Sequence, residues 1–380
     1  MKGSPYENPV GESAGASPSG VQAVSLEAFR NYASLTLELD PGFNVLQGAN
    51  AQGKTNFLEA LHLLSTTRLL RGMRDAEAIL EGAERAVCAA ELRGSRTSLS
   101  IVIEARVRKR ALLNGMSLPR ASDILGRLPC VCSSLADMPI VAGDPSERRL
   151  FLDMELSRLR PAYLRHLSLF KRALEQRNAL LKASQDVAQP LELFLPWEEQ
   201  IATHGAALRR YRADYVEALA SQAKAIHAYL GGGEALTLAY VAKDEGTSAE
   251  RLAEELARQR PRDMLRGTTS VGPHRDDVGI TIGDREARLF ASQGQQRTAV
   301  LAMKMGTLAL GAAELGKPPL LLLDDILADL DEGRRAKLVE WVVAHAGQAV
   351  LTCTEIDSVG SEIRGRARLF RVAGGNVYDA

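Results

Sequence analysis

The run Phe43-Asn44-Val45-Leu46-Gln47-Gly48-Ala49-Asn50-Ala51-Gln52-Gly53-Lys54-Thr55 decides the fold of this chain. Its last eight residues fit G-x-x-x-x-G-K-[ST], the phosphate-binding loop of nucleoside triphosphatases. The residues before it read as a strand, and residues 57–66 carry leucines at helical spacing. Because this loop needs a strand before it and a helix after it, the sequence predicts an ATP site at Gly48, Ala49, Asn50, Ala51, Gln52, Gly53, Lys54 and Thr55.

Phosphate chemistry explains the residue types in this loop. Gly48 and Gly53 let backbone N–H groups turn toward phosphate oxygens, and the N-terminus of the following helix favours an anion. Lys54 adds a positive charge at the β- and γ-phosphates, so we expect a catalytic role for it. Thr55 is expected to bind Mg²⁺ through its hydroxyl.

A second motif, Leu320-Leu321-Leu322-Leu323-Asp324-Asp325, reads as a buried strand that ends in two carboxylates. It is similar to the acidic strand of ABC-type ATPases, which places one carboxylate near Mg²⁺ and the next beside the attacking water. We therefore expect Asp324 to hold Mg²⁺ through water and Asp325 to act as the base. Those ATPases usually have Glu at the second position, and since Asp is one methylene shorter, slow hydrolysis is expected. A solvent-exposed acidic turn is the alternative.

The third motif is Ser292-Gln293-Gly294-Gln295, just before a helix predicted over residues 297–315. It resembles the signature of ABC-type ATPases, in which the helix N-terminus faces the γ-phosphate held by the other subunit. A plain helix cap is the alternative, and the position just before the acidic strand favours the signature. Asp329 and Asp331 follow at the spacing of the D-loop, which crosses the dimer interface in those ATPases. Together these motifs predict an ATP-dependent homodimer.

Composition sets limits on partners and location. The 380 residues contain 47 Lys+Arg and 47 Asp+Glu, so any nucleic-acid surface must be a local patch. The run Arg106, Arg108, Lys109 and Arg110 is a candidate DNA contact, and solvated charge is equally compatible with it. The same two readings apply to Arg209, Arg210 and Arg212. No apolar run reaches the ~18 residues of a membrane span, and the four cysteines read as reduced thiols, so we expect a cytoplasmic protein with no membrane partner.

Changes in residue pattern divide the chain. Residues 1–20 are rich in Gly, Ser and Pro and predict a disordered tail, with a start codon assigned too early as the alternative. Residues 21–39 alternate as an antiparallel strand pair, and Asn114-Gly115 predicts a hairpin turn. Helical periodicity dominates residues 146–264, with two long helices and a shorter one over Ala249–Arg260. We therefore predict a discontinuous head from residues 21–145 and 265–380, with residues 146–264 as an inserted helical arm.

Further segments resemble the RecF family of bacterial recombination-mediator ATPases, which is related to SMC proteins. The matching segments span residues 21–355 and include Phe29-Arg30-Asn31-Tyr32, Arg148-Arg149-Leu150-Phe151-Leu152-Asp153, Gln176-Arg177-Asn178, Gly272-Pro273-His274-Arg275-Asp276-Asp277 and Ser292-Gln293-Gly294-Gln295-Gln296-Arg297. The third and fourth of these are typical of RecF rather than of ABC ATPases at large. A structural role is favoured for His274, and a catalytic role stays open.

The resemblance implies an α/β fold: a two-lobed ABC/SMC-type ATPase head, with a P-loop core sheet, an antiparallel N-terminal sheet and the helical arm. It implies the cofactors ATP and Mg²⁺, weak ATPase activity and an ATP-driven dimer clamp. The implied partners are single-stranded and double-stranded DNA at gaps or junctions, together with RecO and RecR. The implied role is help in loading RecA during DNA repair, replication, recombination and the SOS response to DNA damage.

The chain departs from the usual RecF sequence at one segment. Ser134-Leu135-Ala136-Asp137 stands where RecF sequences usually have Ser-Pro-Glu-Asp, at the place of the nucleotide-sensing Q-loop.

An ABC transporter ATPase is disfavoured because the P-loop and signature lie more than twice the usual distance apart in the sequence. An SMC protein is disfavoured because the helical arm is too short. A binding module without hydrolysis is the remaining alternative, since Asp325 replaces Glu. The presence of Lys54, Thr55 and Asp324 favours a slow ATPase.

Overall fold

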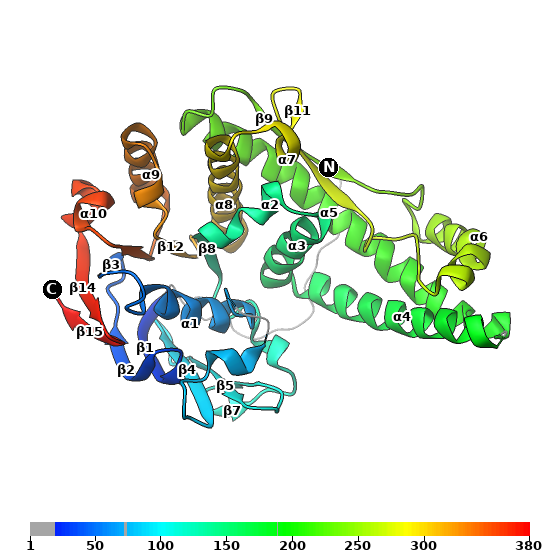
Figure 1. The fold of residues 1–380 in the computed structure, drawn as a ribbon, viewed down its shortest axis with the longest axis horizontal. Coiled ribbons are helices and arrows are strands. Elements are labelled where there is room, and N and C mark those ends of the chain that lie inside the picture. Colours follow the sequence, from blue (N-terminus) through cyan, green and yellow to red (C-terminus); the bar gives the residue numbers. More distant parts are fainter. Residues whose placement is uncertain (1–19, 72–73, 188) are drawn as a thin grey trace, which may run out of the picture.

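The computed structural model describes residues 20–71, 74–187 and 189–380, and the strands in these ranges form three sheets. Figure 1 shows a broad head with two of the sheets and an arm of long helices that extends from it. The tail predicted for residues 1–20 lies outside the described residues, apart from Gly20.

The core sheet carries the phosphate-binding loop and the acidic motif at one edge. Its strands, in spatial order, are β15 (Asn376–Asp379), β14 (Ala367–Ala373), β3 (Phe43–Gln47), β13 (Ala349–Cys353), β12 (Leu320–Asp324) and β8 (Cys130–Ser134). All neighbours are parallel except β14 and β15. The carboxyl ends of parallel strands meet at one edge, which brings the ends of β3, β12 and β13 together.

Both faces of the core sheet are covered, which explains the unbroken apolar run in β12. Leu321 and Leu323 pack into a core with the arm helices, and Leu320 and Leu322 into a second core with the antiparallel sheet. A parallel strand buried on both sides reads as continuous hydrophobic sequence rather than as alternation. The predicted buried strand is therefore confirmed.

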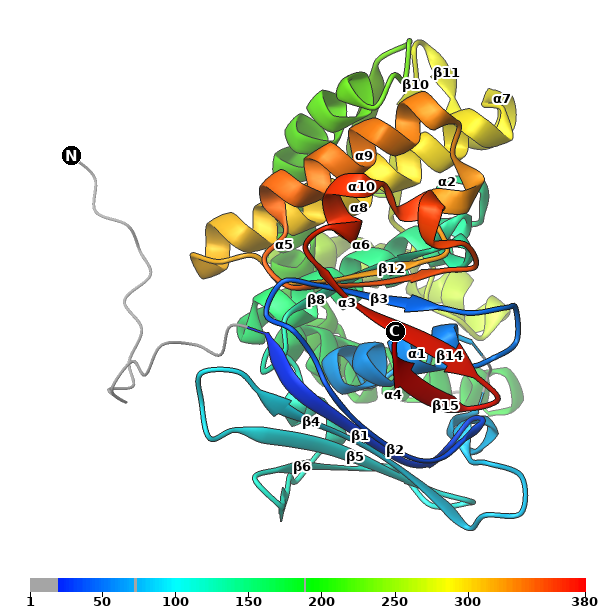
Figure 2. The same cartoon turned by 90° about the vertical axis from the view of Figure 1, so that its left-hand side faces the viewer.

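The second sheet is antiparallel and lies on the other side of helix α1 (Lys54–Thr66), as Figure 2 shows. Its strands, in spatial order, are β2 (Tyr32–Glu38), β1 (Val21–Phe29), β4 (Arg85–Leu92), β5 (Ser98–Glu104), β6 (Arg110–Leu113) and β7 (Met116–Ser117). The predicted strand pair over residues 21–39 is confirmed as β1 and β2. The predicted hairpin is also confirmed, with Asn114 and Gly115 at positive φ between β6 and β7.

Long helices form the arm and reach back into the head. They are α3 (Pro145–Leu159), α4 (Pro161–Asp186), α5 (Leu195–Tyr229) and α6 (Ala249–Arg266). The apolar stripe of α5 joins the same core as α4 and α6, and also packs against α8 (Gln293–Leu315) in the head. The third sheet lies beside α5. Its strands, in spatial order, are β11 (Arg285–Glu286), β10 (Asp277–Ile282) and β9 (Leu236–Val241). Since β9 pairs with β10 across residue 264, the domain boundaries drawn from the sequence stay a prediction.

Helix α6 is longer than the sequence pattern indicates. The prediction ended the helix at Arg260. Pro261 follows, and proline disfavours a helix interior because it removes a helical N–H and crowds the preceding turn. The helix instead continues to Arg266 with Pro261 inside it. Asp263, just beyond the proline, makes a buried ion pair with Arg177 of α4. Tertiary contact at that turn thus outweighs the local preference.

The remaining helices are α2 (Pro139–Ala142), α7 (Ala287–Phe290), α9 (Glu332–His345) and α10 (Ser361–Arg364). Figure 2 places α8, α9 and α10 on the face of the core sheet away from α1. Among the described helices, α8 alone has the length and apolar character that a membrane span requires. Most of that apolar stretch is buried inside the protein, as in the core helix of a globular fold.

Candidate nucleotide-binding site

The phosphate-binding loop takes a backbone path that only particular residues allow. Gly53 has a φ of +121°, and a Cβ there would lie 2.8 Å from Asn31 Nδ2. A Cβ at Gly48 would collide with the carbonyl oxygen of Val372. Glycine is therefore needed at both positions for close packing, as well as for turning N–H groups toward an anion.

Lys54 begins helix α1 and lies beneath the loop. Its side chain is buried, and its Nζ donates hydrogen bonds to the carbonyl oxygens of Gly48 at 2.6 Å and Ala49 at 3.0 Å. The ammonium group is therefore held inside the curve of the loop, where phosphate oxygens would gather.

Thr55 and Asp324 meet although 269 residues separate them in the chain. Thr55 Oγ1 donates to Asp324 Oδ1 at 2.9 Å, and Thr352 Oγ1 of β13 donates to the same oxygen at 2.8 Å. A hydroxyl and a carboxylate are the hard oxygen ligands that Mg²⁺ prefers, with water and phosphates completing its shell. This pair of side chains therefore fits Mg²⁺.

Asp325 carries an unusual carboxylate. Its φ is +56°, and its backbone N–H donates to Thr352 Oγ1 at 2.9 Å. Oδ1 is buried and has no hydrogen-bond partner among the described residues. Burial raises the pKa of Asp325, the negative charges of Asp324 and Asp329 add to this, and Lys54 opposes it. A half-buried carboxylate with an unpartnered oxygen and a raised pKa has the properties of a general base.

The signature residues lie at the exposed start of α8. Ser292 caps the helix, since its Oγ accepts from Gln295 N at 3.3 Å while Gln295 Oε1 accepts from Ser292 N at 2.8 Å. Ser292 and Gln293 are exposed, and Gly294 and Gln295 are half-buried. Within the described part of the chain, no hydrogen bond or ion pair joins this segment to the phosphate-binding loop of the same chain.

The predicted D-loop residues also lie on the surface. Asp331 caps α9 by accepting from Arg334 N at 2.9 Å, and Asp329 is exposed just before it. The structure thus brings the phosphate-binding loop and Asp324 together and leaves the signature and D-loop facing outward.

The segment that departs from the family pattern, residues 134–137, keeps a defined structure. Ser134 lies beside Asp324 in the register of β8 and β12. Asp137 accepts from Ser134 N at 2.8 Å and forms a 2.8 Å ion pair with Lys304 of α8. The aspartate of this segment therefore connects the nucleotide edge of the sheet to the helix that carries the signature.

Contacts that the sequence did not reveal support the loop from two sides. Asn31 Nδ2 donates to Gln52 O at 2.9 Å and Tyr32 OH donates to Gly53 O at 2.9 Å. On the other side, Gly374 N donates to Gln52 Oε1 at 2.7 Å from the turn between β14 and β15. Gly374-Gly375 between two alternating segments is a hairpin signal that could have predicted this turn.

The two segments typical of RecF sequences form buried ion networks in the arm. Arg177 has no exposed surface and donates to Asp263 at 2.8 Å and to Glu198 at 3.0 Å. Asp276, also fully buried, accepts from Arg209 at 2.7 Å. These contacts join α4 to α5 and α6, and join α5 to the residue just before β10, which gives both segments a structural role.

Two of the arginines considered for DNA contact have a different role. Arg209 and Arg212 are buried, and Arg212 donates to Asp153 at 2.7 Å. They are neither phosphate contacts nor solvated charges, so both readings from the sequence are wrong for this pair. Sequence could not show this, because their partners lie on other elements.

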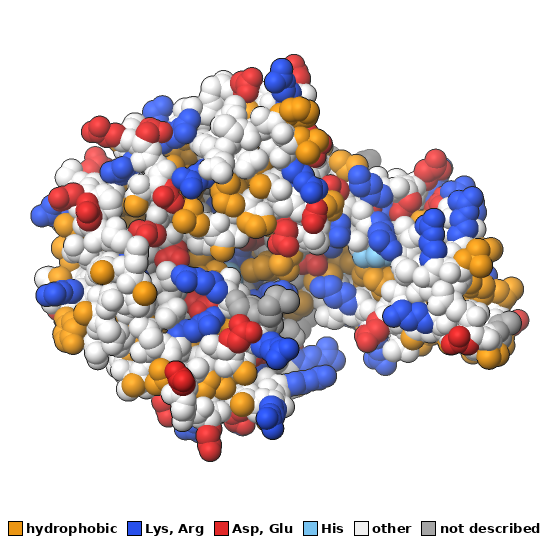
Figure 3. All heavy atoms as spheres, in the orientation of Figure 1, with side chains coloured by type: hydrophobic (Ala, Val, Ile, Leu, Met, Phe, Trp, Pro, Cys, Tyr) orange, Lys and Arg blue, Asp and Glu red, His pale blue; other side chains and the backbone are white. Residues whose placement is uncertain are grey.

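The predicted basic loop is partly neutralised. Lys109 pairs with Asp75 at 2.8 Å and Arg110 with Glu104 at 2.6 Å. Arg106 and Arg108 are exposed and make no ion pair with any described residue. Figure 3 shows Lys and Arg side chains lying among Asp and Glu across the head on the face drawn. A DNA contact at this loop stays a prediction.

His274 packs against Phe170 of the arm helix α4 rather than lying at the nucleotide site. Its Nε2 lies 3.1 Å from the carbonyl oxygen of Thr269, and its buried Nδ1 lacks a partner in the described ranges. Burial lowers the pKa of His274 to about 4. These contacts support a structural role.

Comparison with known proteins agrees with this geometry. The family model described as RecF/RecN/SMC N terminal domain matches residues 20–360. The chain is 42% identical over 372 residues to the DNA replication and repair protein RecF of Symbiobacterium thermophilum, covering 94% of this chain and 97% of that protein. It is 38% identical over 366 residues to the protein of the same name from Thermosynechococcus vestitus, covering 94% and 96%.

Solved structures give the same result. A structure of the recombination mediator protein RecF with ATP, described as part of the RecFOR pathway, aligns with a TM-score of 0.88 at 28% identity, covering 97% of this chain and 100% of that one. A Smc head domain from Pyrococcus furiosus aligns with a TM-score of 0.55 at 16% identity, which reflects a shared fold alone. The predicted α/β head of ABC/SMC type is thereby confirmed. The chain belongs to the RecF family of ABC/SMC-type ATPases.

Proposed function

We propose that this protein is an ATP-dependent DNA-binding protein of DNA replication and repair that works as a nucleotide-gated dimer clamp. The observation that carries the proposal is the meeting of Thr55 and Asp324 at 2.9 Å beside the phosphate-binding loop, while Ser292 is exposed elsewhere. One chain thus carries both the phosphate-binding loop and the signature, but it does not bring the two together around one ATP. A second copy would complete the site.

The loop residues have separate tasks in ATP binding. Backbone N–H groups of residues 48–55 and the start of α1 bind the phosphates. Lys54 Nζ exchanges its contacts to Gly48 O and Ala49 O for β- and γ-phosphate oxygens. Thr55, and Asp324 through water, hold Mg²⁺, which supplies charge neutralisation to the phosphates when bound.

Asp325 is the proposed base for hydrolysis. Its unpartnered Oδ1 can accept a hydrogen bond from the attacking water and orient it toward the γ-phosphate. Because the carboxylate of Asp is one methylene shorter than that of Glu, it stands farther from the phosphate, which favours slow turnover. The second candidate function is a module that binds ATP without hydrolysing it. It differs from the slow ATPase only in whether Asp325 activates the attacking water.

Dimer closure follows from the exposed segments. Ser292 and Gly294 of one protomer approach the γ-phosphate on the other, with Asp329 and Asp331 nearby in the interface. Loss of the γ-phosphate removes the attraction across the interface, so the dimer opens and releases DNA. ATP thereby selects the closed state.

The wider role rests on the relatives. The solved RecF structures belong to a RecFOR pathway by their own description, which supports RecO and RecR as partners of this chain. We extend this to binding at single-strand gaps or junctions and to help in loading RecA, in a cytoplasmic setting.

A gel-shift experiment tests the function directly. Binding is measured with and without ATP and Mg²⁺ on duplex, single-stranded and gapped DNA of equal length. Tighter binding with ATP, strongest on the gapped substrate, is the expected result. Equal binding with and without ATP would contradict nucleotide gating, and no binding to any substrate would contradict the DNA-binding role.

A further inference from the structure

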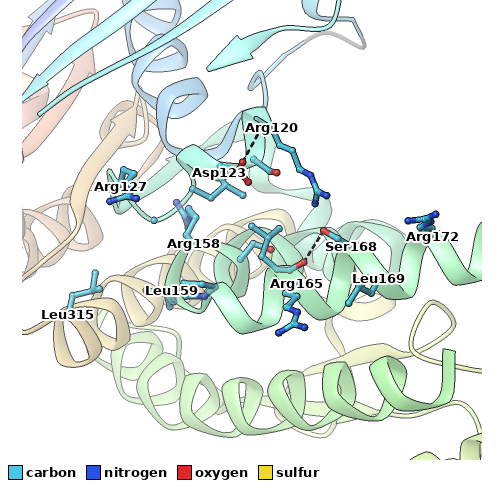
Figure 4. Close-up of a pocket in the computed structure, with 16 residues that line it drawn as sticks. Arg120, Asp123, Arg127, Arg158, Leu159, Arg165, Ser168, Leu169, Arg172 and Leu315 are labelled. Carbon is cyan, nitrogen blue, oxygen red and sulfur yellow. Dashed lines mark hydrogen bonds between the residues drawn. The ribbon is translucent and has the colours of Figure 1, made fainter. Parts of the chain in front are cut away.

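A basic groove lies between the head and the arm, on a surface that none of the motifs identified. It encloses about 850 Å³. One wall is the segment around residues 120–127 of the head, and the other is the first half of α4, as Figure 4 shows. Arg120 and Arg127 belong to the first wall and Arg165 and Arg172 to the second. We call these four residues with the space between them the arginine groove.

The arginine groove is remote from the ATP site. Leu315, the last residue of α8, lines it, whereas the signature stands at the other end of that helix. A helix of 23 residues is about 34 Å long. The groove also adjoins residues just before β8, so it lies at the amino edge of the core sheet, opposite the edge that carries the phosphate-binding loop. It therefore stays accessible when two heads close on ATP.

The described residues do not neutralise the positive charge of the groove. In the part of the chain that the structure describes, the four arginine side chains make no ion pair, and all four are exposed. Arg158 beneath them is buried and is already paired with Glu155. Asp123 is the one carboxylate among the described lining residues, and it accepts the backbone N–H of Arg120 at 3.1 Å. Four exposed guanidinium groups without an ion pair around one groove point to an external anion.

The lining indicates which anion fits. Arginines and serines line both walls, and both are side chains that contact DNA phosphates. Arg165 and Arg172 are seven residues apart on one face of α4, or about 10 Å along it. That interval spans about three phosphates of one DNA strand along the duplex axis. No described residue in the lining is aromatic, so the groove lacks the stacking platforms by which proteins hold single-stranded bases.

We propose that the arginine groove binds the phosphate backbone of duplex DNA, on the flank of each protomer away from its ATP site and without need of ATP. The proposal rests on the proposed DNA-binding function and adds to it a second contact surface. In a closed dimer the two grooves face outward, so each protomer can hold duplex beside the region where the clamp acts. Because the contacts are to phosphate alone, this binding is independent of sequence and strongly dependent on salt.

The test compares two variants of the full-length protein that lose equal charge. The groove variant carries Arg120→Gln, Arg127→Gln, Arg165→Gln and Arg172→Gln. The control carries Arg96→Gln, Arg251→Gln, Arg262→Gln and Arg266→Gln, at exposed arginines outside the groove that make no ion pair with a described residue. Binding of a fluorescein-labelled duplex is followed by anisotropy without nucleotide, over about 50 to 200 mM salt.

The slope of log K against log salt is negative, and each phosphate neutralised contributes about −0.9 to it. For the groove variant we expect this slope to become shallower by about 3 to 4. At low salt its affinity should fall at least about tenfold, while the control keeps the slope of the unaltered protein. Equal slopes for the groove variant and the control would overturn the proposal. Loss of affinity for single-stranded DNA but not for duplex would also overturn it.

Two further measurements separate this result from other causes. ATP-dependent dimerisation, followed by sedimentation, should be unchanged in the groove variant. If the unaltered protein does not dimerise with ATP, the proposed clamp is wrong, while the groove proposal is still tested by the duplex assay. Polyglutamate is added as a competitor in the duplex assay. If it binds through the four arginines while the duplex slope is unchanged, the groove serves an acidic protein segment, and the DNA assignment is wrong.

Discussion

Thr55 Oγ1 and Asp324 Oδ1 lie 2.9 Å apart, and Thr352 Oγ1 holds the same carboxylate oxygen from the next strand at 2.8 Å. The helix after the phosphate-binding loop and the end of β12 are therefore joined at one point. This point is where Mg²⁺ fits, so the geometry predicts how hydrolysis should respond to change there.

Asp324→Asn should lower ATP hydrolysis by about 10- to 100-fold, because an amide holds the Mg²⁺-bound water less well than a carboxylate does. The measurement is phosphate release over a range of Mg²⁺ concentrations, with Asp284→Asn at an exposed site as the matched control. If Asp324→Asn keeps the rate and the Mg²⁺ requirement of the unaltered protein, the assignment of this carboxylate is wrong.

Asp325→Asn tests whether the half-buried carboxylate, with its unpartnered Oδ1, is the base. Removing a general base lowers the rate by about 10² to 10⁴. ATP binding should persist, so the ATP-dependent dimer should accumulate rather than turn over. Asp325→Glu restores the longer side chain of other ABC ATPases and should hydrolyse ATP faster than the unaltered protein. An unchanged, measurable rate in both variants would show that Asp325 is not the base. Absence of hydrolysis in the unaltered protein and in both variants would favour the module that binds ATP without hydrolysing it.

Arg177→Met should destabilise the arm. Arg177 and Asp263 both have no exposed surface, and removing the arginine leaves the buried carboxylate without its cation. Breaking such a pair costs about 3 to 5 kcal/mol. Chemical denaturation gives the free energy of unfolding, and Lys182→Met, exposed on the same helix, should change it by less than about 0.5 kcal/mol. Similar values for the two variants would contradict the structural role of the Gln176-Arg177-Asn178 segment.

His274 should contribute to loss of stability in acid. Burial lowers its pKa in the folded protein to about 4, against an ordinary value of about 6.5. The unfolded chain therefore binds the proton more tightly between these values, and stability is present above pH ~6.5 and declines as the pH falls toward 4. The shift corresponds to roughly 3 kcal/mol at most.

The measurement is the free energy of unfolding at about pH 7 and about pH 5, in the unaltered protein and in His274→Gln. The variant should lose less stability between the two pH values. Some acid sensitivity should remain, because burial also lowers the pKa of His62 and His227. An equal loss in both proteins would show that His274 is not held in the neutral form.

Much of the fold could be predicted because its signals are local. The phosphate-binding loop, the Asn114-Gly115 turn and the apolar strand before Asp324 each depend on residues next to one another in the chain. The continuation of α6 through Pro261 could not be predicted, since a distant ion pair outweighs the local preference.

The roles of buried arginines show the same limit more strongly. Arg177 finds partners 21 and 86 residues away, and Arg209 finds one 67 residues away. In the sequence Arg209, beside Arg210 and Arg212, resembles part of an exposed basic patch. The groove arginines are the opposite case, because Arg120 and Arg165 become neighbours only when the head and the arm pack together.

The central claim is that two copies of this chain share each ATP, with Ser292 of one completing the site of the other. Sedimentation of Ser292→Arg with ATP and Mg²⁺ tests it most directly, with nucleotide binding measured alongside. The account predicts that the variant binds ATP as the unaltered protein does but stays monomeric, because the larger cationic side chain blocks the approach to the γ-phosphate. A variant that forms the ATP-dependent dimer to the normal extent would contradict the account.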